Sequence, residues 1–278
     1  MPELPEVETV ARLIAPDVLQ KRVTGVRAHW RKTGGGLTDE ELEAALVGRR
    51  FVRVERRAKY ILMGLAPGRS KLPDTWLVVH LRMTGRLVVA PSREAPAAHT
   101  RFSVTLGTRR LDFIDPRKFG RCLVASDPTD VLPALGPEPL EDGFEVEAFV
   151  RDLRARKRQL KPLLLDQAFV AGLGNIYVDE ALHSAGLHPL TPGHRVTRPR
   201  ARALHAAIRT VLAEAIEREG SSFDTFYRTP TGQPGSYQHQ FQVYGRQGQP
   251  CRTCGAEIRK VVVGQRGTHF CARCQRRR

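Results

Sequence analysis

The sequence predicts an α+β protein with an N-terminal β-sandwich domain, flanking helices and a C-terminal helical domain that ends in a β-hairpin. Three observations support this fold class. Short runs rich in β-branched residues occupy the chain from about position 21 to 126, and helical periodicity replaces them beyond about position 144. Four of the five cysteines then form two C-x-x-C pairs near the end of the chain.

The first expected element is a helix at residues 5–15, with the sequence PEVETVARLIA. Val7, Val10 and Ile14 recur at helical spacing and therefore share one face. Pro5 suits the first helical position, where a missing N–H costs no hydrogen bond. The chain is thus expected to open with an amphipathic helix.

Strands are expected next, because short β-branched runs alternate with turn residues. The runs are 51–55, 60–65, 75–83, 86–90, 100–106, 109–115 and 121–126. Seven or eight strands at this spacing are typical of a β-sandwich. Cys122, the one cysteine outside the pairs, is expected to be a buried strand residue.

A proline-rich segment at 127–143 separates this region from a helical one. Apolar residues at helical spacing predict helices near 146–153 and 199–220, and a long loop is expected within 221–248. The expected divisions of the chain are a domain at 1–131, a linker at 132–140, a helical domain at 141–240 and a cysteine-containing finger at 241–278.

The charge balance indicates a polyanionic partner. Lys and Arg number 45 against 29 Asp and Glu, which gives a formal net charge of +16, and nucleic acid is the commonest polyanion. No apolar run approaches the roughly 20 residues of a membrane-spanning helix. The acidic N-terminus lacks the apolar segment of a secretory signal, so a cytoplasmic, nucleoid-associated protein is expected.

The cysteine spacing predicts one structural Zn²⁺. Cys251, Cys254, Cys271 and Cys274 match the C-x2-C…C-x2-C pattern of four-thiolate sites, which leave no position for a reactive water. The residues between the pairs are expected to form a β-hairpin with Arg266 at its tip. Arg266 then either contacts a ligand from a rigid finger or is simply solvated.

Two further motifs suggest nucleic-acid contacts. Gly172 and Gly174 precede Asn175, an expected helix N-cap, just after a basic run at 156–161, and a helix N-terminus can bind phosphate. A plain connection between helices is the alternative. In IDPRKFGR, Phe119 follows two basic residues in a turn and could wedge between bases, although a lone loop Phe is usually buried in the core.

The N-terminal MPELPEVETV places acidic residues beside Pro2 in a basic protein. Removal of Met1 would give Pro2 a secondary amine that can form an iminium ion with a carbon electrophile. Glu3 would be the nearest general acid or base, and the helix N-terminus would help to keep Glu6 ionised. Taken alone, the motif favours an ordinary acidic first turn, which is common at helix N-termini.

Together, PELPEVET, RRAKY, DPRKFG, the glycine–asparagine turn and the cysteine finger resemble bacterial formamidopyrimidine-DNA glycosylases over essentially the whole chain. The related endonuclease VIII branch typically opens Pro-Glu-Gly-Pro-Glu, so Leu4 favours the formamidopyrimidine branch. The resemblance implies a helix–two-turns–helix arrangement in the C-terminal domain. It also implies that DNA lies between the two domains.

The implied activity is bifunctional base excision repair of duplex DNA, with removal of 8-oxoguanine and ring-opened purines followed by β,δ-elimination at the abasic site. By resemblance, Pro2 is the nucleophile and Glu3 the essential acid. Lys59 assists proton transfer, and Arg266 holds phosphates and serves δ-elimination. Ala58 replaces the glycine that usually precedes this lysine, a departure that concerns only the local backbone conformation.

DNA-contacting residues are implied in the same way. Met83, Arg117 and Phe119 match the residues that enter the duplex, with Arg117 reading the orphaned cytosine. The other implied DNA-contacting positions are His80, His99, Lys157 and Asn175. The loop at 229–239 matches the lesion-recognition loop, with no individual contact assigned.

The competing interpretation is a non-catalytic zinc-finger protein that binds DNA on the same scaffold. Such a protein has no need of Pro2, Glu3 and Lys59 together, so the enzyme is preferred. The expected partner is double-stranded DNA with oxidised purines or abasic sites, and the expected state is a monomer without membrane contact. The sequence leaves the preference among oxidised purines and oxidised pyrimidines open.

Overall fold

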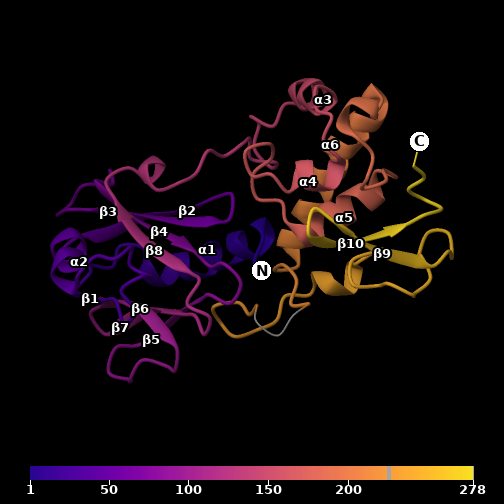
Figure 1. Cartoon of the computed structure of the whole chain (residues 1–278). Helices are drawn as coiled ribbons and strands as arrows, with labels where there is room; N and C mark the ends of the chain where they lie inside the picture. Colours follow the sequence, from indigo (N-terminus) through magenta and orange to yellow (C-terminus); the bar gives the residue numbers. More distant parts are fainter. Residues whose placement is uncertain (224–226, 278) are drawn as a thin grey trace. The chain divides into compact units, whose positions relative to one another are not determined.

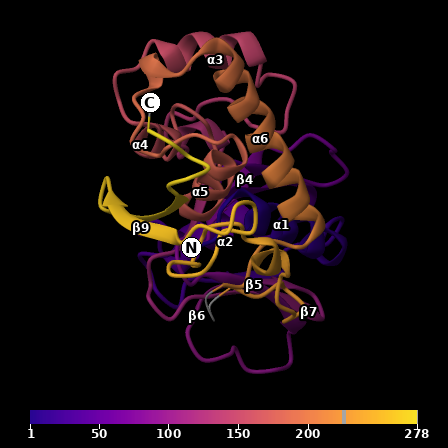
Figure 2. The ribbon, with the colours of Figure 1, turned by 90° about the vertical axis from the view of Figure 1, so that its right-hand side faces the viewer.

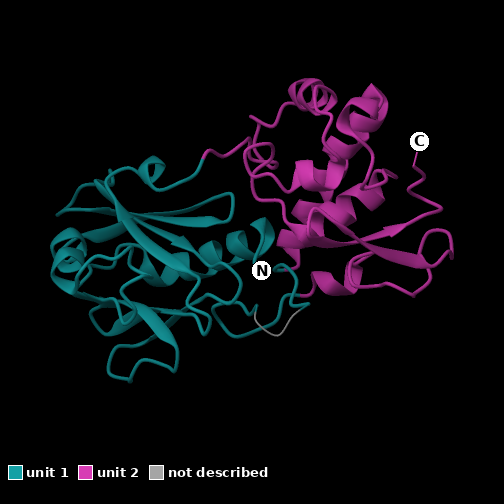
Figure 3. Cartoon of the chain, viewed as in Figure 1, with its two compact units in different colours: residues 1–133, 219–235 teal, residues 134–218, 236–278 magenta. Residues whose placement is uncertain are grey.

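The computed structural model describes residues 1–223 and 227–277, which form two compact units (Figure 3). Unit 1 consists of Met1–Pro133 and Glu219–Gly235. Unit 2 consists of Ala134–Arg218 and Ser236–Arg278. The first crossing between the units falls inside the proline-rich segment at 127–143.

Unit 1 contains two four-stranded antiparallel sheets (Figure 1). One has the strand order β1-β6-β7-β5 and the other β2-β3-β4-β8. The strands are β1 Gly25–Arg27, β2 Arg50–Arg57, β3 Tyr60–Ala66, β4 Thr75–His80, β5 Arg86–Pro91, β6 Thr100–Leu106, β7 Arg109–Ile114 and β8 Arg121–Ala125. The predicted sandwich is confirmed, and each of the seven predicted runs overlaps one of the strands β2–β8.

The core of unit 1 joins helix α1 (Leu4–Val18) to both sheets. Val10 and Ile14 of α1 are buried in one apolar cluster with Phe51 of β2 and Phe113 of β7. Burying side chains of this size typically stabilises a fold by about 1.5–3 kcal/mol each. Cys122 lies in β8 and is buried, as expected, and burial raises the pKa of its thiol.

Helix α2 (Asp39–Leu46) was not expected from the sequence. Thr38 caps it by accepting a hydrogen bond from the Glu41 N–H at 3.2 Å, and Glu41 Oε2 accepts one from the Thr38 N–H at 2.8 Å. Leu42 and Leu46, on one face of α2, are its buried residues. The Thr-x-x-Glu spacing of this capping box was the available sequence signal.

Unit 2 combines helices with one hairpin. Its helices are α3 Val146–Arg154, α4 Leu160–Leu164, α5 Asn175–Ser184 and α6 Arg198–Glu217. Its strands are β9 Ile258–Val263 and β10 Arg266–Cys271, and short 3-10 helices lie at Gly193–Arg195 and Tyr237–Gln240. A further 3-10 helix, Pro128–Asp130, belongs to unit 1. Helix α6 contacts α3 and α5, and Figure 2 shows α3 beside α6. The predicted helices near 146–153 and 199–220 correspond to α3 and α6.

Within the described residues, no helix is both long and apolar enough to cross a membrane.

The segment Glu219–Gly235 belongs to unit 1, although the sequence placed it in the helical domain at 141–240. The physical reason is a set of hydrogen bonds from its first residues to the start of α1, described below. The long loop expected within 221–248 includes residues 224–226, which lie outside the described residues.

Candidate functional site

The first turn of α1 gathers three N-terminal residues in a buried cluster: Pro2, Glu3 and Glu6. Glu3 is the N-cap of the helix, and its backbone N–H donates to Oε2 of Glu6 at 2.8 Å. The helix begins at Leu4, so Pro5 is its second residue rather than its first. The N-terminal end of a helix stabilises negative charge, which suits two carboxylates at this position.

Glu6 also connects this cluster to the segment Glu219–Gly235. Its Oε1 accepts hydrogen bonds from Ser221 N at 2.8 Å and from Ser221 Oγ at 3.3 Å. Gly220 has a φ of 75°, and a Cβ there would lie 2.7 Å from Glu6 Oε1, so the close approach requires glycine. Sequence reasoning missed this role, because the partner of Glu6 is 215 residues away.

Lys59 lies in the two-residue turn between β2 and β3, where Arg57 pairs with Tyr60. Its side chain is buried, at 6% exposure. Ala58, the other turn residue, has a φ of 53°. Two-residue hairpin turns favour glycine at positive φ, so the alanine occupies a position where a left-handed backbone is required.

His80, at the end of β4, is a buried neutral base. Its Nδ1 accepts a hydrogen bond from the Arg82 N–H at 3.0 Å, and its ring meets Tyr60 edge-on at 4.5 Å between centroids. Burial, then the positive charges of Arg82 and Lys59, lower the pKa of His80 to about 3. The imidazole is therefore uncharged near neutral pH, with its proton on Nε2.

Asp115, which is fully buried, joins two loops of unit 1. Its carboxylate accepts hydrogen bonds from Gly120 N at 2.7 Å and Arg117 N at 3.2 Å in the loop between β7 and β8. It also accepts a hydrogen bond from the hydroxyl of Thr84, in the turn between β4 and β5. One carboxylate thus connects the turn that carries Met83 with the loop that carries Arg117.

These loops expose two large apolar side chains, Met83 at 41% and Phe119 at 46%. The Arg117 guanidinium lies over the Phe119 ring, 4.7 Å from its centroid. The alternative in which Phe119 is buried in the core is therefore wrong. Exposed apolar side chains beside a cation match a surface that meets stacked bases.

His99 belongs to the same region of unit 1. Its carbonyl accepts a hydrogen bond from the Asp115 N–H at 3.0 Å, and its Nδ1 lies 3.2 Å from a guanidinium nitrogen of Arg101. Unit 1 therefore brings Met83, His99, Arg117 and Phe119 together on loops that meet at Asp115.

In unit 2, Asn175 is the first residue of α5, and Gly174 is its N-cap, so the expected N-cap role of Asn175 is wrong. The amide is used instead to bind the hairpin: Nδ2 donates to the carbonyl of Gly267 in β10 at 2.9 Å. Its Oδ1 is buried and has no hydrogen-bond partner among the described residues.

The basic run at 156–161 divides into exposed and buried members. Lys157 is exposed between α3 and α4. Lys161 is fully buried and forms an ion pair with Asp179, 2.7 Å between Nζ and Oδ1. The expectation that Lys161 contributes to a basic surface is therefore wrong, because a carboxylate inside the fold neutralises it.

The finger at the end of unit 2 is a β-hairpin of β9 and β10, as predicted. Gly264 and Gln265 form its two-residue turn with φ of 56° and 62°, a geometry typical of tight hairpins. Arg266 is the first residue of β10, paired with Val263, rather than the tip itself. Its side chain is exposed.

At the base of this hairpin the four cysteines form a metal site. The sulfur atoms of Cys251, Cys254, Cys271 and Cys274 all lie within 4.8 Å of one another. A tetrahedral zinc with Zn–S bonds of about 2.3 Å separates its sulfurs by about 3.8 Å, so the four residues fit one structural Zn²⁺.

The cysteine pKa values indicate why the four sulfurs require a cation. Burial opposes ionisation of Cys251, but backbone N–H groups and His183, 3.7 Å away, lower its pKa to about 6. Burial and the neighbouring sulfurs raise the pKa of Cys274. Four close thiolates therefore need a cation to be stable together, and a bound Zn²⁺ would supply that charge.

Family models account for nearly the whole chain. Residues 1–122 match the formamidopyrimidine-DNA glycosylase N-terminal domain, residues 135–227 match the formamidopyrimidine-DNA glycosylase H2TH domain, and residues 248–277 match the zinc finger found in FPG and IleRS.

Relatives and solved structures agree with this assignment. Formamidopyrimidine-DNA glycosylases of Chloroflexus aggregans and Thermus thermophilus are 47% and 44% identical, over 99% of this chain and 98% of each relative. A mutant FPG of Lactococcus lactis in complex with a Fapy-dG containing DNA has a TM-score of 0.91 at 35% identity, over 99% of this chain and 100% of that chain. The MutM (FPG) protein of Thermus thermophilus has a TM-score of 0.87 at 42% identity, over 99% of this chain and 98% of that chain. The chain therefore belongs to the formamidopyrimidine-DNA glycosylase family, DNA-repair glycosylases that also act as abasic-site lyases.

Proposed function

We propose that this chain removes oxidised purines, namely 8-oxoguanine and formamidopyrimidines, from duplex DNA and then cuts the strand by β,δ-elimination. Complexes of the Lactococcus lactis relative with Fapy-dG DNA and with abasic-site DNA support this substrate class. The net charge of +16 supports a polyanionic partner. The enzyme acts as a monomer on the DNA of the cytoplasm, where thiols stay reduced for zinc.

The observation that carries the proposal is the buried pair of Pro2 and Glu3 at the start of α1. Once Met1 is removed, the secondary amine of Pro2 attacks C1′ of the damaged nucleotide. The glycosidic electron pair leaves with the base, which takes up a proton. Glu3 supplies or relays protons to the base and to the opening sugar, because negative charge develops on both.

Opening of the sugar leaves an iminium ion between Pro2 and C1′. The iminium acidifies the C2′ hydrogens, so loss of one of them expels the 3′ phosphate. A second elimination expels the 5′ phosphate, and Arg266 supplies positive charge and a proton source to that step. Lys59 assists the earlier proton transfers from its buried turn, where the neighbouring His80 ring is uncharged.

The target base must leave the stack before C1′ can be attacked. Met83 and Arg117 fill the vacated space, and Phe119 wedges the adjacent base step. The exposure of both apolar side chains on loops fixed by Asp115 supports this assignment. Arg117 reads the orphaned cytosine through hydrogen bonds to its edge.

Phosphate contacts come from polar groups of both units. Asn175 contributes from the N-terminus of α5, where a helix end favours anions. Lys157 contributes from its exposed position, and His99 and Arg266 contact the backbone near the lesion. Such contacts position the duplex without reading its sequence.

Borohydride trapping tests the proposal on duplexes that carry defined lesions. We expect reduction of the iminium to give a covalent protein–DNA adduct that peptide mapping places on Pro2. Retention of Met1 should abolish trapping and excision, because residue 2 then has an amide nitrogen. Glu3→Gln should keep lesion binding and lose base excision.

Three outcomes would contradict parts of the proposal. An adduct mapped to Lys59 would remove Pro2 as the nucleophile. Lesion binding without any adduct would indicate a non-catalytic DNA-binding protein. Faster trapping on oxidised pyrimidines than on 8-oxoguanine would replace the proposed substrate class.

A further inference from the structure

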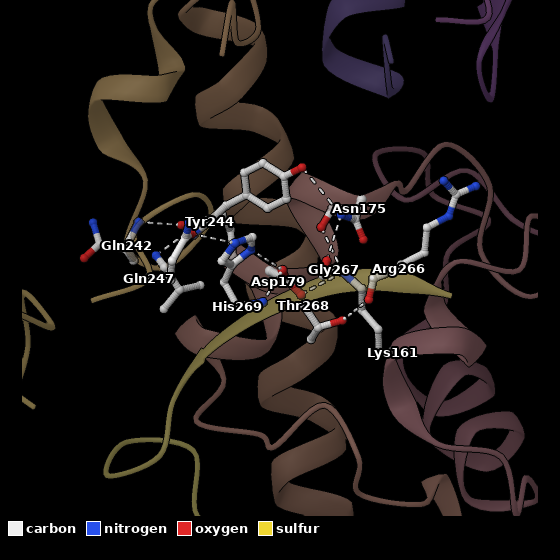
Figure 4. Close-up of polar contacts among 12 residues, drawn as sticks. Lys161, Asn175, Asp179, Gln242, Tyr244, Gln247, Arg266, Gly267, Thr268 and His269 are labelled. Atoms are coloured by element: carbon white, nitrogen blue, oxygen red, sulfur yellow. Dashed lines mark hydrogen bonds and ion pairs between the residues drawn. The ribbon is translucent and has the colours of Figure 1, made fainter. Parts of the chain in front are cut away.

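An ion pair between α4 and α5 is fully removed from solvent. Lys161 Nζ donates to Asp179 Oδ1 at 2.7 Å, and both side chains have 0% exposure. Lys161 Nζ also donates to the carbonyl of Asn175 at 2.9 Å. Figure 4 shows these groups converging on the side of α5 that faces β10. Removing both charges from water carries a desolvation cost that their mutual attraction must offset, so the pair by itself is weak evidence of stabilisation.

The second carboxylate oxygen of Asp179 holds the finger. Oδ2 accepts a hydrogen bond from the His269 backbone N–H at 2.8 Å. The His269 ring packs edge-on against Tyr244, 4.9 Å between centroids, and its Nε2 lies 3.1 Å from Gln247 Oε1. One carboxylate therefore connects α4, through Lys161, to strand β10.

A second connection lies one helical turn away. Asn175 and Asp179 are four residues apart on α5 and so share a face. Asn175 Nδ2 donates to the Gly267 carbonyl at 2.9 Å and approaches the Tyr244 hydroxyl at 3.5 Å. Strand β10 is thus attached to α5 at Gly267 and at His269, with the fully buried Thr268 between them.

We propose that Asp179, neutralised by Lys161, is a positioning residue that fixes Arg266 and Asn175 relative to each other for phosphate binding and δ-elimination. This inference rests on the proposed function of those two residues. Arg266 directly precedes Gly267 in β10, so its backbone position follows from the two attachments. The carboxylate is needed because no apolar side chain can accept the His269 N–H.

Loss of Asp179 should change the products of the lyase rather than its first step. In Asp179→Leu/Lys161→Met both charges are removed together, which avoids an unpaired buried charge. We expect this double variant to fold, to bind one zinc and to form the Pro2 adduct. Its ratio of δ- to β-elimination product should fall by about tenfold to a hundredfold, because a displacement of about 1 Å is enough to cost that much.

The experiment compares the full-length, zinc-loaded double variant with wild type on a duplex containing an abasic site. Asp179→Asn, which keeps the size of the side chain, is the second variant and should show the same direction of change. Asp152→Asn is the matched control, because its ion pair with Arg151 is exposed at 51% and 69%. The control should leave the product ratio unchanged.

The outcomes separate this inference from the proposed function. No adduct in the wild type would contradict the proposed function itself. A normal adduct in a double variant with full zinc and an unchanged product ratio would overturn the positioning role. A product ratio that falls equally in Asp152→Asn would overturn it as well.

Discussion

Ala58 has a φ of 53°, a left-handed backbone in which the Cβ crowds the following carbonyl. Ala58→Gly removes that Cβ, so we expect the free energy of unfolding to rise by about 1 kcal/mol. Ala155, at the end of α3, has a φ of −74°, and glycine there should lower stability by about 0.5–1 kcal/mol. Chemical denaturation of both variants measures the effect. A less stable Ala58→Gly protein would show that the turn is not strained.

The stability of the folded protein should depend on pH through His80. Its folded pKa of about 3 is below the ordinary value of 6.5, so the unfolded chain binds a proton more readily as pH falls. The resulting stability is complete above pH 6.5 and is lost progressively from there toward pH 3. At pH 4.5 the loss from this group is about 2–3 kcal/mol.

His80→Gln cannot titrate, so its stability should depend less on pH between 6.5 and 3 than that of wild type. Denaturant unfolding of both proteins at several pH values measures the difference. Parallel pH profiles would show that folding does not lower the pKa of His80.

Single residues were predictable where their signal was local. The four zinc ligands are identified by spacing within 24 residues, and the exposed position of Arg266 follows from the hairpin between them. Lys161 was misplaced because its sequence neighbours are basic, whereas its buried partner Asp179 lies 18 residues away in the chain. The assignment of catalytic roles came from family resemblance and remains a proposal.

The turn between β4 and β5 and the loop between β7 and β8 both depend on Asp115. Asp115→Ala leaves the N–H groups of Gly120 and Arg117 without their acceptor, which should cost about 1–3 kcal/mol of stability. We expect excision of 8-oxoguanine from duplex DNA to fall more than cleavage at a preformed abasic site, where no base has to be everted.

Thr84→Val is the matched control, since it removes only the hydroxyl that Asp115 accepts. It should disturb the turn that carries Met83 and leave the loop of Arg117 in place, so its effect on excision should be smaller. Measuring excision and abasic cleavage on the same duplex sequence compares the two variants directly. Equal losses of both activities in Asp115→Ala would contradict a role in base eversion.

The sequence predicted the strands of unit 1 better than its second helix. The strands β2–β8 were predicted because apolar and β-branched residues concentrate between turn residues. Helix α2 was missed because only Leu42 and Leu46 are buried on it, too few to establish helical periodicity in eight residues. Its capping box carried the signal instead.

For the whole molecule, the chain was expected to divide at its proline-rich segment, and the first crossing between the units lies there. The return of Glu219–Gly235 to unit 1 was not predictable, because it depends on Glu6 and Ser221, which meet only in the folded chain. The net charge of +16 indicates a nucleic-acid partner without any knowledge of which residues meet in the fold, since charge acts over the whole surface.

That charge should make the affinity for DNA depend steeply on salt concentration. If about six phosphates are neutralised, the logarithm of the association constant should fall against the logarithm of salt concentration with a slope near −5. Lys157→Ala should weaken binding to all duplexes alike and reduce the magnitude of the slope by about 1, because its contact is to phosphate.

Arg117→Ala should instead weaken the binding free energy by about 1–3 kcal/mol and reduce the preference for cytosine opposite the lesion. Titrations with matched duplexes at several salt concentrations distinguish the two variants. A slope near zero for wild type would contradict phosphate neutralisation, and an unchanged preference in Arg117→Ala would remove that residue's reading role.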